Sequence, residues 1–161
     1  INLQPNHSLH NERVASFIWH SKQLGCTVEY FFAKLPRNLE MQFPVSNESS
    51  LENMDKLVGD IISSKIKYTA VFVPSDTMAN LFYIVCRNRK IQIGKDINII
   101  SCNNERTIVS HLEPTLTTIN INIKDLSYRA VDQLMWRATN PTISSMVSIT
   151  ISPDLIKGDS A

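Results

Sequence analysis

The feature that most constrains this fold is the alternation of helical apolar spacing with short, strongly apolar runs. Residues 11–24 carry apolar side chains three, four and seven positions apart, and Gly25 follows as a helix stop. Residues 27–32 come next and are rich in β-branched and aromatic residues, which favours a strand. Repeated alternation of this kind predicts an α/β fold in which helices cover both faces of a parallel sheet.

The same alternation continues to the end of the chain. Further helices are expected at residues 49–65, directly after Pro74 with Ser75 or Asp76 as the cap, and at residues 125–139. The expected strands are residues 69–73, residues 97–100, residues 117–123 as an outer strand, and residues 146–151 as the closing strand. Residues 35–47 contain two prolines and no apolar period, which indicates a long loop.

Composition limits the class of protein. A chain of 161 residues with 43% hydrophobic and 19% charged residues fits one globular domain, or a piece of a slightly larger one. Its apolar runs are only a few residues long, far short of the roughly 20 that span a bilayer, so no membrane partner is expected. The net charge is +1, and the one dense basic stretch, residues 87–95, suits a solvated helix end. By itself the chain therefore lacks the basic surface that DNA binding requires.

Catalytic chemistry finds little support in the residue pattern. The four histidines are scattered and form no metal motif, and no serine or cysteine is spaced to define a nucleophile site. The sequence therefore predicts no enzyme, no cofactor and no metal. Three cysteines without a close pair, together with no visible secretory leader in residues 1–10, favour reduced thiols in the cytoplasm. These cysteines are Cys26, Cys86 and Cys102.

Polar residues follow the expected strands at the edge where α/β sheets bind ligands. Ser75 and Asp76 follow one strand, Asn103 and Asn104 follow the next, and Arg13 lies in the first turn of the first helix. Because ligands bind outside the carboxyl ends of parallel strands, these side chains are expected along a single rim.

The rim residues combine a fixed cation, a carboxylate, and groups that both donate and accept hydrogen bonds. Neighbouring sugar hydroxyls need that mixture. Each residue also has a purely structural explanation: Asp76 as a helix cap, Asn103 as a turn residue, and Arg13 as a solvated side chain. Asp76 could serve as both cap and ligand.

Several sequence blocks resemble one family of bacterial regulators. Pro-Thr-Leu-Thr-Thr-Ile at residues 114–119 is similar to the P-x-L-T-T-[IV] signature of the C-terminal lobe of LacI/GalR regulators, and Ser-Asp-Thr-Met-Ala at residues 75–79 resembles their N-D-x-x-A. Arg-Val-Ala-Ser-Phe at residues 13–17 resembles R-x-x-G-[FWY]. Residues 94–104 resemble P-x-D-[IV]-x-[IV]-[IV] followed by G-[FY]-D-[DN], and residues 155–160 resemble L-[VI]-x-R-x-S. The order and spacing of the blocks cover nearly the whole chain.

The resemblance implies a type I periplasmic-binding-protein-like fold, in which two lobes joined by three crossovers close around an effector. Residues 1–24 would be the end of the N-terminal lobe and a crossover with the first helix, and residues 25–120 the core of the C-terminal lobe. Residues 121–161 would form a crossover helix, a returning strand and the tail. The implied function is sugar sensing in a homodimeric transcriptional repressor. DNA would be bound only through an N-terminal domain absent from this chain.

Matching positions imply specific roles for individual residues. The expected effector contacts are Arg13, Ser75, Asp76 and Asn103. The expected dimer contacts are Leu81, Phe82 and Val109, from residues 79–87 and 108–112, because these apolar side chains would otherwise be exposed.

The chain also departs from the family pattern. Asn103 replaces an aspartate that accepts hydrogen bonds from ligand hydroxyls, and Gly158 replaces an arginine. Ser16, Leu81 and Ser101 replace glycines. The departures predict an effector different from those of well-known members, or a degenerate lobe used only for dimerisation. A periplasmic-type solute receptor with the same fold is the other alternative, and would be monomeric.

Overall fold

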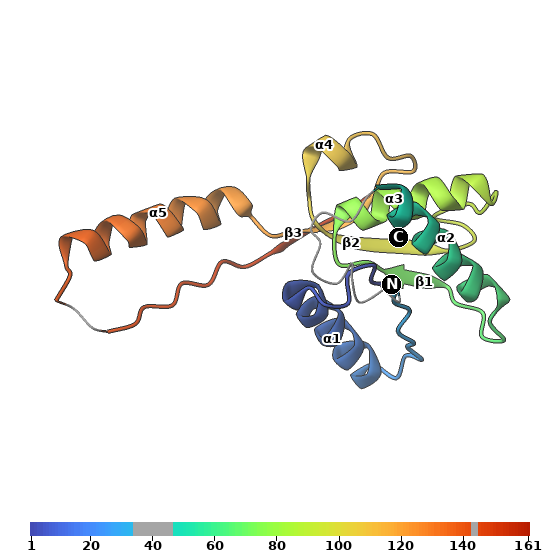
Figure 1. Ribbon diagram of the computed structural model, residues 1–161, viewed down its shortest axis with the longest axis horizontal. Coiled ribbons are helices and arrows are strands. Elements are labelled where there is room, and N and C mark those ends of the chain that lie inside the picture. The colour runs from blue at the N-terminus through green and yellow to red at the C-terminus, as the bar shows by residue number, and fades with distance from the viewer. Residues whose placement is uncertain (34–46, 143–144) are drawn as a thin grey trace.

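The computed structural model describes residues 1–33, 47–142 and 145–161. In chain order the elements are α1 (Ser8–Gln23), α2 (Asn47–Ser63), β1 (Ala70–Phe72), α3 (Asp76–Asn88), β2 (Asn98–Asn103), α4 (Arg106–Val109), β3 (Thr117–Asn120), α5 (Ile123–Thr139) and β4 (Asp154–Ile156) (Figure 1). The four strands form one sheet in the order β1-β2-β3-β4. The predicted α/β class is confirmed.

The strands of the sheet do not all run in the same direction. Strands β1, β2 and β3 are parallel, whereas β4 pairs antiparallel with β3. Expecting residues 117–123 to be an outer strand was wrong, because β4 lies on the far side of β3 and takes the edge. The sheet is therefore mixed rather than wholly parallel.

Helices cover both faces of the sheet, as the apolar pattern predicted. Successive strand residues point to opposite faces. Val71, Val73 and Ile99 pack with apolar residues of α2 and α3 in the main core. Phe72 of the opposite face packs with Val14 of α1 in a smaller cluster. The polar rim is built on this two-sided arrangement.

Residues 1–3 belong to the main core. The Ile1 amine donates to the Phe72 carbonyl at 2.8 Å, and Asn2 forms a parallel bridge with Phe32. Ile1 and Leu3 are both buried in the core that α2 and α3 share. The division of residues 1–24 between an N-terminal lobe and a crossover stays a prediction. Residues 1–3 extend the same α/β body beyond β1.

Two expected strands are not formed. Residues 27–32 make only the isolated bridge at Phe32, because Asn2 is the one residue paired with them in the described part of the chain. Residues 146–151 have no strand beside them, and the closing strand is β4 at Asp154–Ile156 instead. A strand needs a partner, so β-propensity alone did not decide these segments. The expected loop 35–47 lies outside the described residues, except that its last residue begins α2.

Helix α5 and the chain that returns from it project away from the α/β body (Figure 1). The helix predicted at residues 125–139 is confirmed and begins two residues earlier. None of its residues is buried, and Leu134 exposes 68% of its surface. Other exposed large apolar residues of α5 are Ile123, Leu126, Tyr128, Val131, Met135 and Trp136. Among the described residues, no helix is long and apolar enough to cross a membrane.

Candidate functional site

Arg13 joins three segments that are distant in the sequence. Its Nη1 donates to the Pro74 carbonyl at 2.7 Å and to Asn103 Oδ1 at 2.9 Å. These partners lie just beyond β1 and at the last residue of β2, so the guanidinium lies at the carboxyl ends of both strands. Its Nε and Nη2 have no hydrogen-bond partner within the described segments, and the side chain is half-buried. Free guanidinium donors therefore remain at the rim.

Asp76 is the most constrained polar group at the rim. Its side chain has no exposed surface. Oδ1 accepts hydrogen bonds from the hydroxyls of Ser101 and, at 2.8 Å, of Thr118. Oδ2 accepts from the Glu105 backbone N–H at 2.7 Å. One carboxylate thus fastens the start of α3 to β2, β3 and the turn before α4. Because it has no exposed surface, a ligand could reach it only if the residues around it moved.

Ser75 is the N-cap of α3. The sequence allowed either Ser75 or Asp76 as the cap, and the structure has Ser75. Its backbone is extended, and its Oγ accepts a hydrogen bond from the Met78 N–H at 3.4 Å. Asp76 lies in the first turn, where a carboxylate also favours the positive end of the helix dipole. Ser75 is only 6% exposed, so capping accounts for its side chain in this structure.

Asn103 and Asn104 adopt backbone conformations that few side chains tolerate. Their φ angles are 119° and 58°, in the left-handed half of conformational space, where asparagine is enriched. Asn103 uses its oxygen to accept from Arg13 and its amide to donate to Glu105 Oε1 at 3.2 Å. Such conformations persist only where the surroundings hold them, and they cluster at ligand sites. Arg13, Asp76 and Asn103 therefore lie on one rim, as the strand-end rule predicted.

A cavity of about 730 Å³, whose lining residues are mostly of polar type, opens beside this rim. Its lining residues are Asn103, Asn104, Glu105, Arg106, Asn120, Ile121, Asn122, Ile123, Lys124 and Asp125. Sequence reasoning missed the second half of this set. The signal was present, because Asn120 ends β3 in the same way that Asn103 ends β2, and the strand-end rule applies to both.

Asn122 fixes the point where the chain leaves the sheet for α5. It adopts a left-handed conformation, and its Nδ2 donates to the Ser152 carbonyl at 2.9 Å and to Asp154 Oδ2 at 2.8 Å. Asn120 donates to Asn122 Oδ1 at 2.6 Å. The outgoing and returning segments of the α5 arm are thus tied together beside the cavity.

Comparison with known proteins assigns the family. The sequence profile of the periplasmic binding protein-like domain matches residues 5–161, which is nearly the whole chain. The chain belongs to this family. The ribose operon repressor of Escherichia coli strain K12 is 30% identical over 101 residues, which are 63% of this chain and 30% of that repressor. The repressor of Shigella flexneri matches equally.

Solved structures of regulators share the fold. A lac repressor bound to ONPG aligns with a TM-score of 0.71 at 16% identity, covering 94% of this chain and 41% of that one. A LacI family regulator from Enterococcus faecium with bound ribose gives 0.70 at 20% identity, over 92% and 50%. The regulator CelR in complex with cellobiose gives 0.69 at 19% identity, over 93% and 42%. These structures confirm the expected periplasmic-binding-protein-like fold. The chain spans 30% of the length of the curated relatives it matches.

The residues assigned to a dimer contact occupy different environments in this member of the family. Phe82 is 1% exposed and lies in the main core, so the expectation that it would be exposed in a monomer was wrong. Leu81 on α3 and Val109 on α4 are half-buried against that core and retain some accessible surface. The periodicity of α3 predicted its apolar face correctly. It did not distinguish a residue at the centre of that face, such as Phe82, from one at its margin, such as Leu81.

One titratable side chain near Arg13 has a shifted pKa. Burial, together with the neighbouring His7 and Arg13 charges, lowers the pKa of His10 to about 4. The two histidine rings are stacked 4.2 Å apart. His10 Nδ1 is buried and has no hydrogen-bond partner in the described residues. The neutral form of His10 is therefore favoured in the folded protein.

Proposed function

We propose that this chain is the small-molecule sensing domain of a DNA-binding transcriptional regulator, and that its effector is a sugar. The observation that carries the proposal is the hydrogen bond of 2.9 Å from the Arg13 guanidinium to Asn103 Oδ1, because Asn103 also lines the cavity of about 730 Å³ beside the rim. Guanidinium and amide groups in this arrangement suit ligands rich in hydroxyls. Ribose and cellobiose in the structures of two similar regulators support the same ligand class.

The proposed effector site uses the rim residues in different ways. Arg13 and Asn103 contact the ligand, and Asn120 extends the contact surface along the cavity. Ser75 and Asp76 remain as expected contacts on the family pattern, although both are buried and engaged within the protein. Their main contribution is to hold the strand ends at fixed spacing. No catalytic step is proposed, because the relatives are repressors.

In this proposal, sugar binding changes the affinity of a cytoplasmic homodimer for DNA. We assign residues 25–120 to the core of one lobe and residues 121–161 to the crossover helix and returning segment, with residues 1–3 joining that same core. Leu81 and Val109 stay as candidate dimer contacts. With a net charge of +1, this chain would leave DNA contact to other parts of the regulator.

Calorimetry of the whole regulator against a panel of mono- and disaccharides tests the effector site. Arg13→Ala should weaken the affinity for the best-binding sugar by on the order of 10- to 100-fold. This is the range expected when hydrogen bonds from a charged donor are lost. Arg129→Ala is the matched control, because that arginine lies on the exposed face of α5, remote from Arg13. Equal affinity in wild type and Arg13→Ala would refute the site. A dimer that binds no sugar in the panel would favour the degenerate lobe.

A further inference from the structure

Arg13 is a half-buried cation whose hydrogen-bond partners are both neutral. Its Nη1 donates to the Pro74 carbonyl at 2.7 Å and to Asn103 Oδ1 at 2.9 Å. A carbonyl and an amide satisfy these donors without neutralising the charge. No carboxylate of the described residues forms an ion pair with Arg13. A partly desolvated charge without a counter-charge is unfavourable, so the site favours a ligand that supplies one.

The edge of the guanidinium formed by Nε and Nη2 is the part of Arg13 that the protein leaves unused. Within the described part of the chain, all of its hydrogen bonds come from Nη1. Neither Nε nor Nη2 is among the buried side-chain atoms that lack a partner there, so both nitrogens keep accessible surface. Two parallel N–H groups match the two oxygens of a carboxylate or a phosphate. A single sugar hydroxyl has one oxygen and cannot form that pair of bonds.

Most half-buried acceptors of the rim already accept hydrogen bonds inside the protein. Both oxygens of Asp76 are used and have no exposed surface. The Asn103 oxygen accepts from the guanidinium, and Asn120 and Asn122 each accept from the other. Of the half-buried asparagines that line the cavity, Asn104 alone has an amide without a partner in the described residues. The rim therefore suits a ligand group that accepts hydrogen bonds and donates none, as an ionised carboxylate does.

The other charges near the rim do not take the place of a ligand anion. Four charged residues line the cavity and all are exposed: Glu105, Arg106, Lys124 and Asp125. Their charges cancel, and water screens exposed charges strongly. Burial raises the pKa of the Cys102 thiol to about 11, and the nearby charges of Arg13 and Asp76 act on it in opposite directions. Asp76 thus lies within electrostatic range of Arg13, but a ligand cannot touch its buried carboxylate.

The start of α1 adds to the positive potential beside Arg13. His7 and His10 precede Arg13 at intervals of three residues, which places the three side chains on one side of the helix. The first turn of α1 holds no acidic residue. The pKa of His10, which is lowered to about 4 by burial and then by the charges of His7 and Arg13, reflects this potential.

We propose that the effector bound at this rim carries an anionic group, a carboxylate or a phosphate, which Arg13 binds through Nε and Nη2. This proposal rests on the proposed sugar-sensing function and narrows the effector to a sugar acid or a sugar phosphate. Asn103 sets the preference, because its neutral amide holds the guanidinium in place and leaves the charge available to the ligand.

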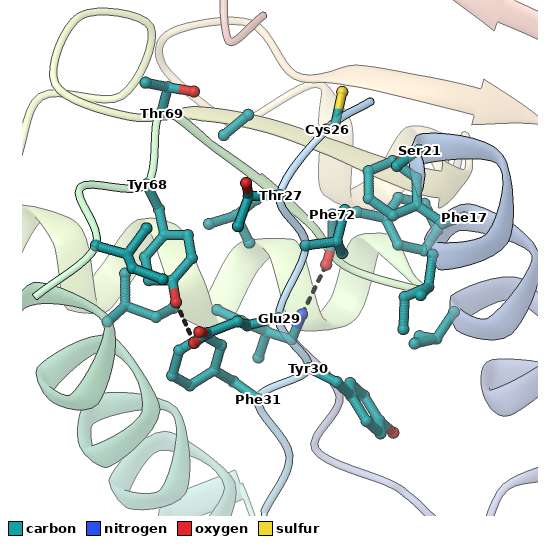
Figure 2. Close-up of a pocket in the computed structure, with 18 of the residues that line it drawn as sticks. Phe17, Ser21, Cys26, Thr27, Glu29, Tyr30, Phe31, Tyr68, Thr69 and Phe72 are labelled. Atoms are coloured by element: carbon teal, nitrogen blue, oxygen red, sulfur yellow. Dashed lines mark hydrogen bonds between the residues drawn. The ribbon is translucent and has the colours of Figure 1, made fainter. Parts of the chain in front are cut away.

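A second cavity has no half-buried side-chain cation among its lining residues. It has a volume of about 520 Å³ and lies between β1 and residues 26–31, where aromatic side chains line it (Figure 2). Glu29 accepts a hydrogen bond from Tyr68 there, and the lining cation Lys67 is exposed. Anions are therefore expected to bind at the rim and not in this second cavity.

Calorimetry of the whole regulator with matched pairs of ligands tests the charge of the effector. Glucuronate is compared with glucose, and ribose 5-phosphate with ribose, so the two pairs separate a carboxylate from a phosphate. The anionic member of at least one pair should bind on the order of tenfold or more tightly than its neutral partner. Its affinity should fall as the salt concentration rises, because salt screens the attraction. Inorganic phosphate and malate serve as anions without a sugar.

Asn103→Asp tests the residue that sets the preference. The new carboxylate would pair with Arg13, so affinity for the anionic ligand should fall on the order of tenfold or more. Asn104→Asp is the matched control, because it adds the same charge to the same cavity at a residue that does not bond Arg13, and its loss should be smaller. Lys67→Ala, which removes a cation from the second cavity, should leave the affinity unchanged.

The possible outcomes separate this proposal from sugar sensing itself. Neutral sugars that bind at least as tightly as their anionic partners would overturn the proposal and leave sugar sensing intact. Equal losses in Asn103→Asp and Asn104→Asp would overturn the role of Asn103, and if Asn103→Asp does not fold, the wild-type pairs and their salt dependence decide. Binding of phosphate or malate but of no sugar would support the anion site and refute sugar sensing. Binding of none of the compounds would overturn both.

Discussion

Replacing Asp76 by asparagine should destabilise the domain strongly although the side chain keeps its shape. The asparagine oxygen can still accept from Ser101 and Thr118, but its NH₂ group would face the Glu105 N–H in place of Oδ2. A hydrogen bond to a charged acceptor contributes about 1.5–3 kcal/mol, and a buried donor left unsatisfied costs a further 1–3 kcal/mol or so. Removing a desolvated charge offsets part of this loss. We therefore expect the free energy of unfolding to fall by roughly 2–4 kcal/mol.

Urea unfolding followed by far-ultraviolet circular dichroism measures this change. With an m-value of about 2 kcal/mol/M, the expected loss lowers the midpoint by about 1–2 M. Asp60→Asn is the matched control, because Asp60 is exposed on α2 and should change stability by less than about 0.5 kcal/mol. Thr118→Val, alone and combined with Asp76→Asn, should show non-additive losses, since Thr118 donates to the same carboxylate whose charge Asp76→Asn removes. An Asp76→Asn variant as stable as the Asp60→Asn control would refute the role assigned to this carboxylate.

Three further predictions follow from packing, backbone geometry and titration. Phe82→Ala should cost about 3–5 kcal/mol of stability at every protein concentration, whereas Leu81→Ser should chiefly weaken association measured by light scattering. Gly158→Ala should destabilise the fold in the same urea assay far more than Gly25→Ala, because a Cβ at Gly158 would overlap the Thr115 carbonyl, whereas at Gly25 the space is open and only the left-handed φ of 76° adds strain. The pKa of His10 is about 4 in the folded state against 6.5 in the unfolded state, so protons bind the unfolded chain first and stability should fall as pH drops from 6.5 to 4. His10→Gln should flatten that fall, and identical profiles for variant and wild type would contradict the assignment.

The sequence predicted elements whose signals are local. Helices α1, α2, α3 and α5 lie within a few residues of their expected bounds, because helical periodicity is set by each segment alone. The polar rim was also predictable, since the position of strand ends in parallel sheets brings Arg13 and Asn103 together despite 90 residues of separation.

Features that depend on distant partners could not be predicted. Residues 146–151 alternate like a strand but have no neighbour, whereas Asp154–Ile156 carries a weaker pattern and pairs with β3. The hydrogen bonds of Asp76 come from donors 25 to 42 residues away, so its sequence context reveals a helix start and nothing of the network. Phe82 was misjudged because a helical stripe shows which face is apolar but not how deeply each position lies.

The structure accounts locally for three of the departures from the expected family pattern. Ser101 stands where the family has glycine, and its hydroxyl donates to Asp76, which adds a bond that glycine could not make. Gly158 stands where the family has arginine, at a point where the Thr115 carbonyl leaves no room for a Cβ. Asn103 loses the charge of the usual aspartate yet still accepts from Arg13 and donates to Glu105. At this rim the neutral amide of Asn103 thus takes the place of the aspartate expected from the resemblance and keeps Arg13 bonded at the strand ends.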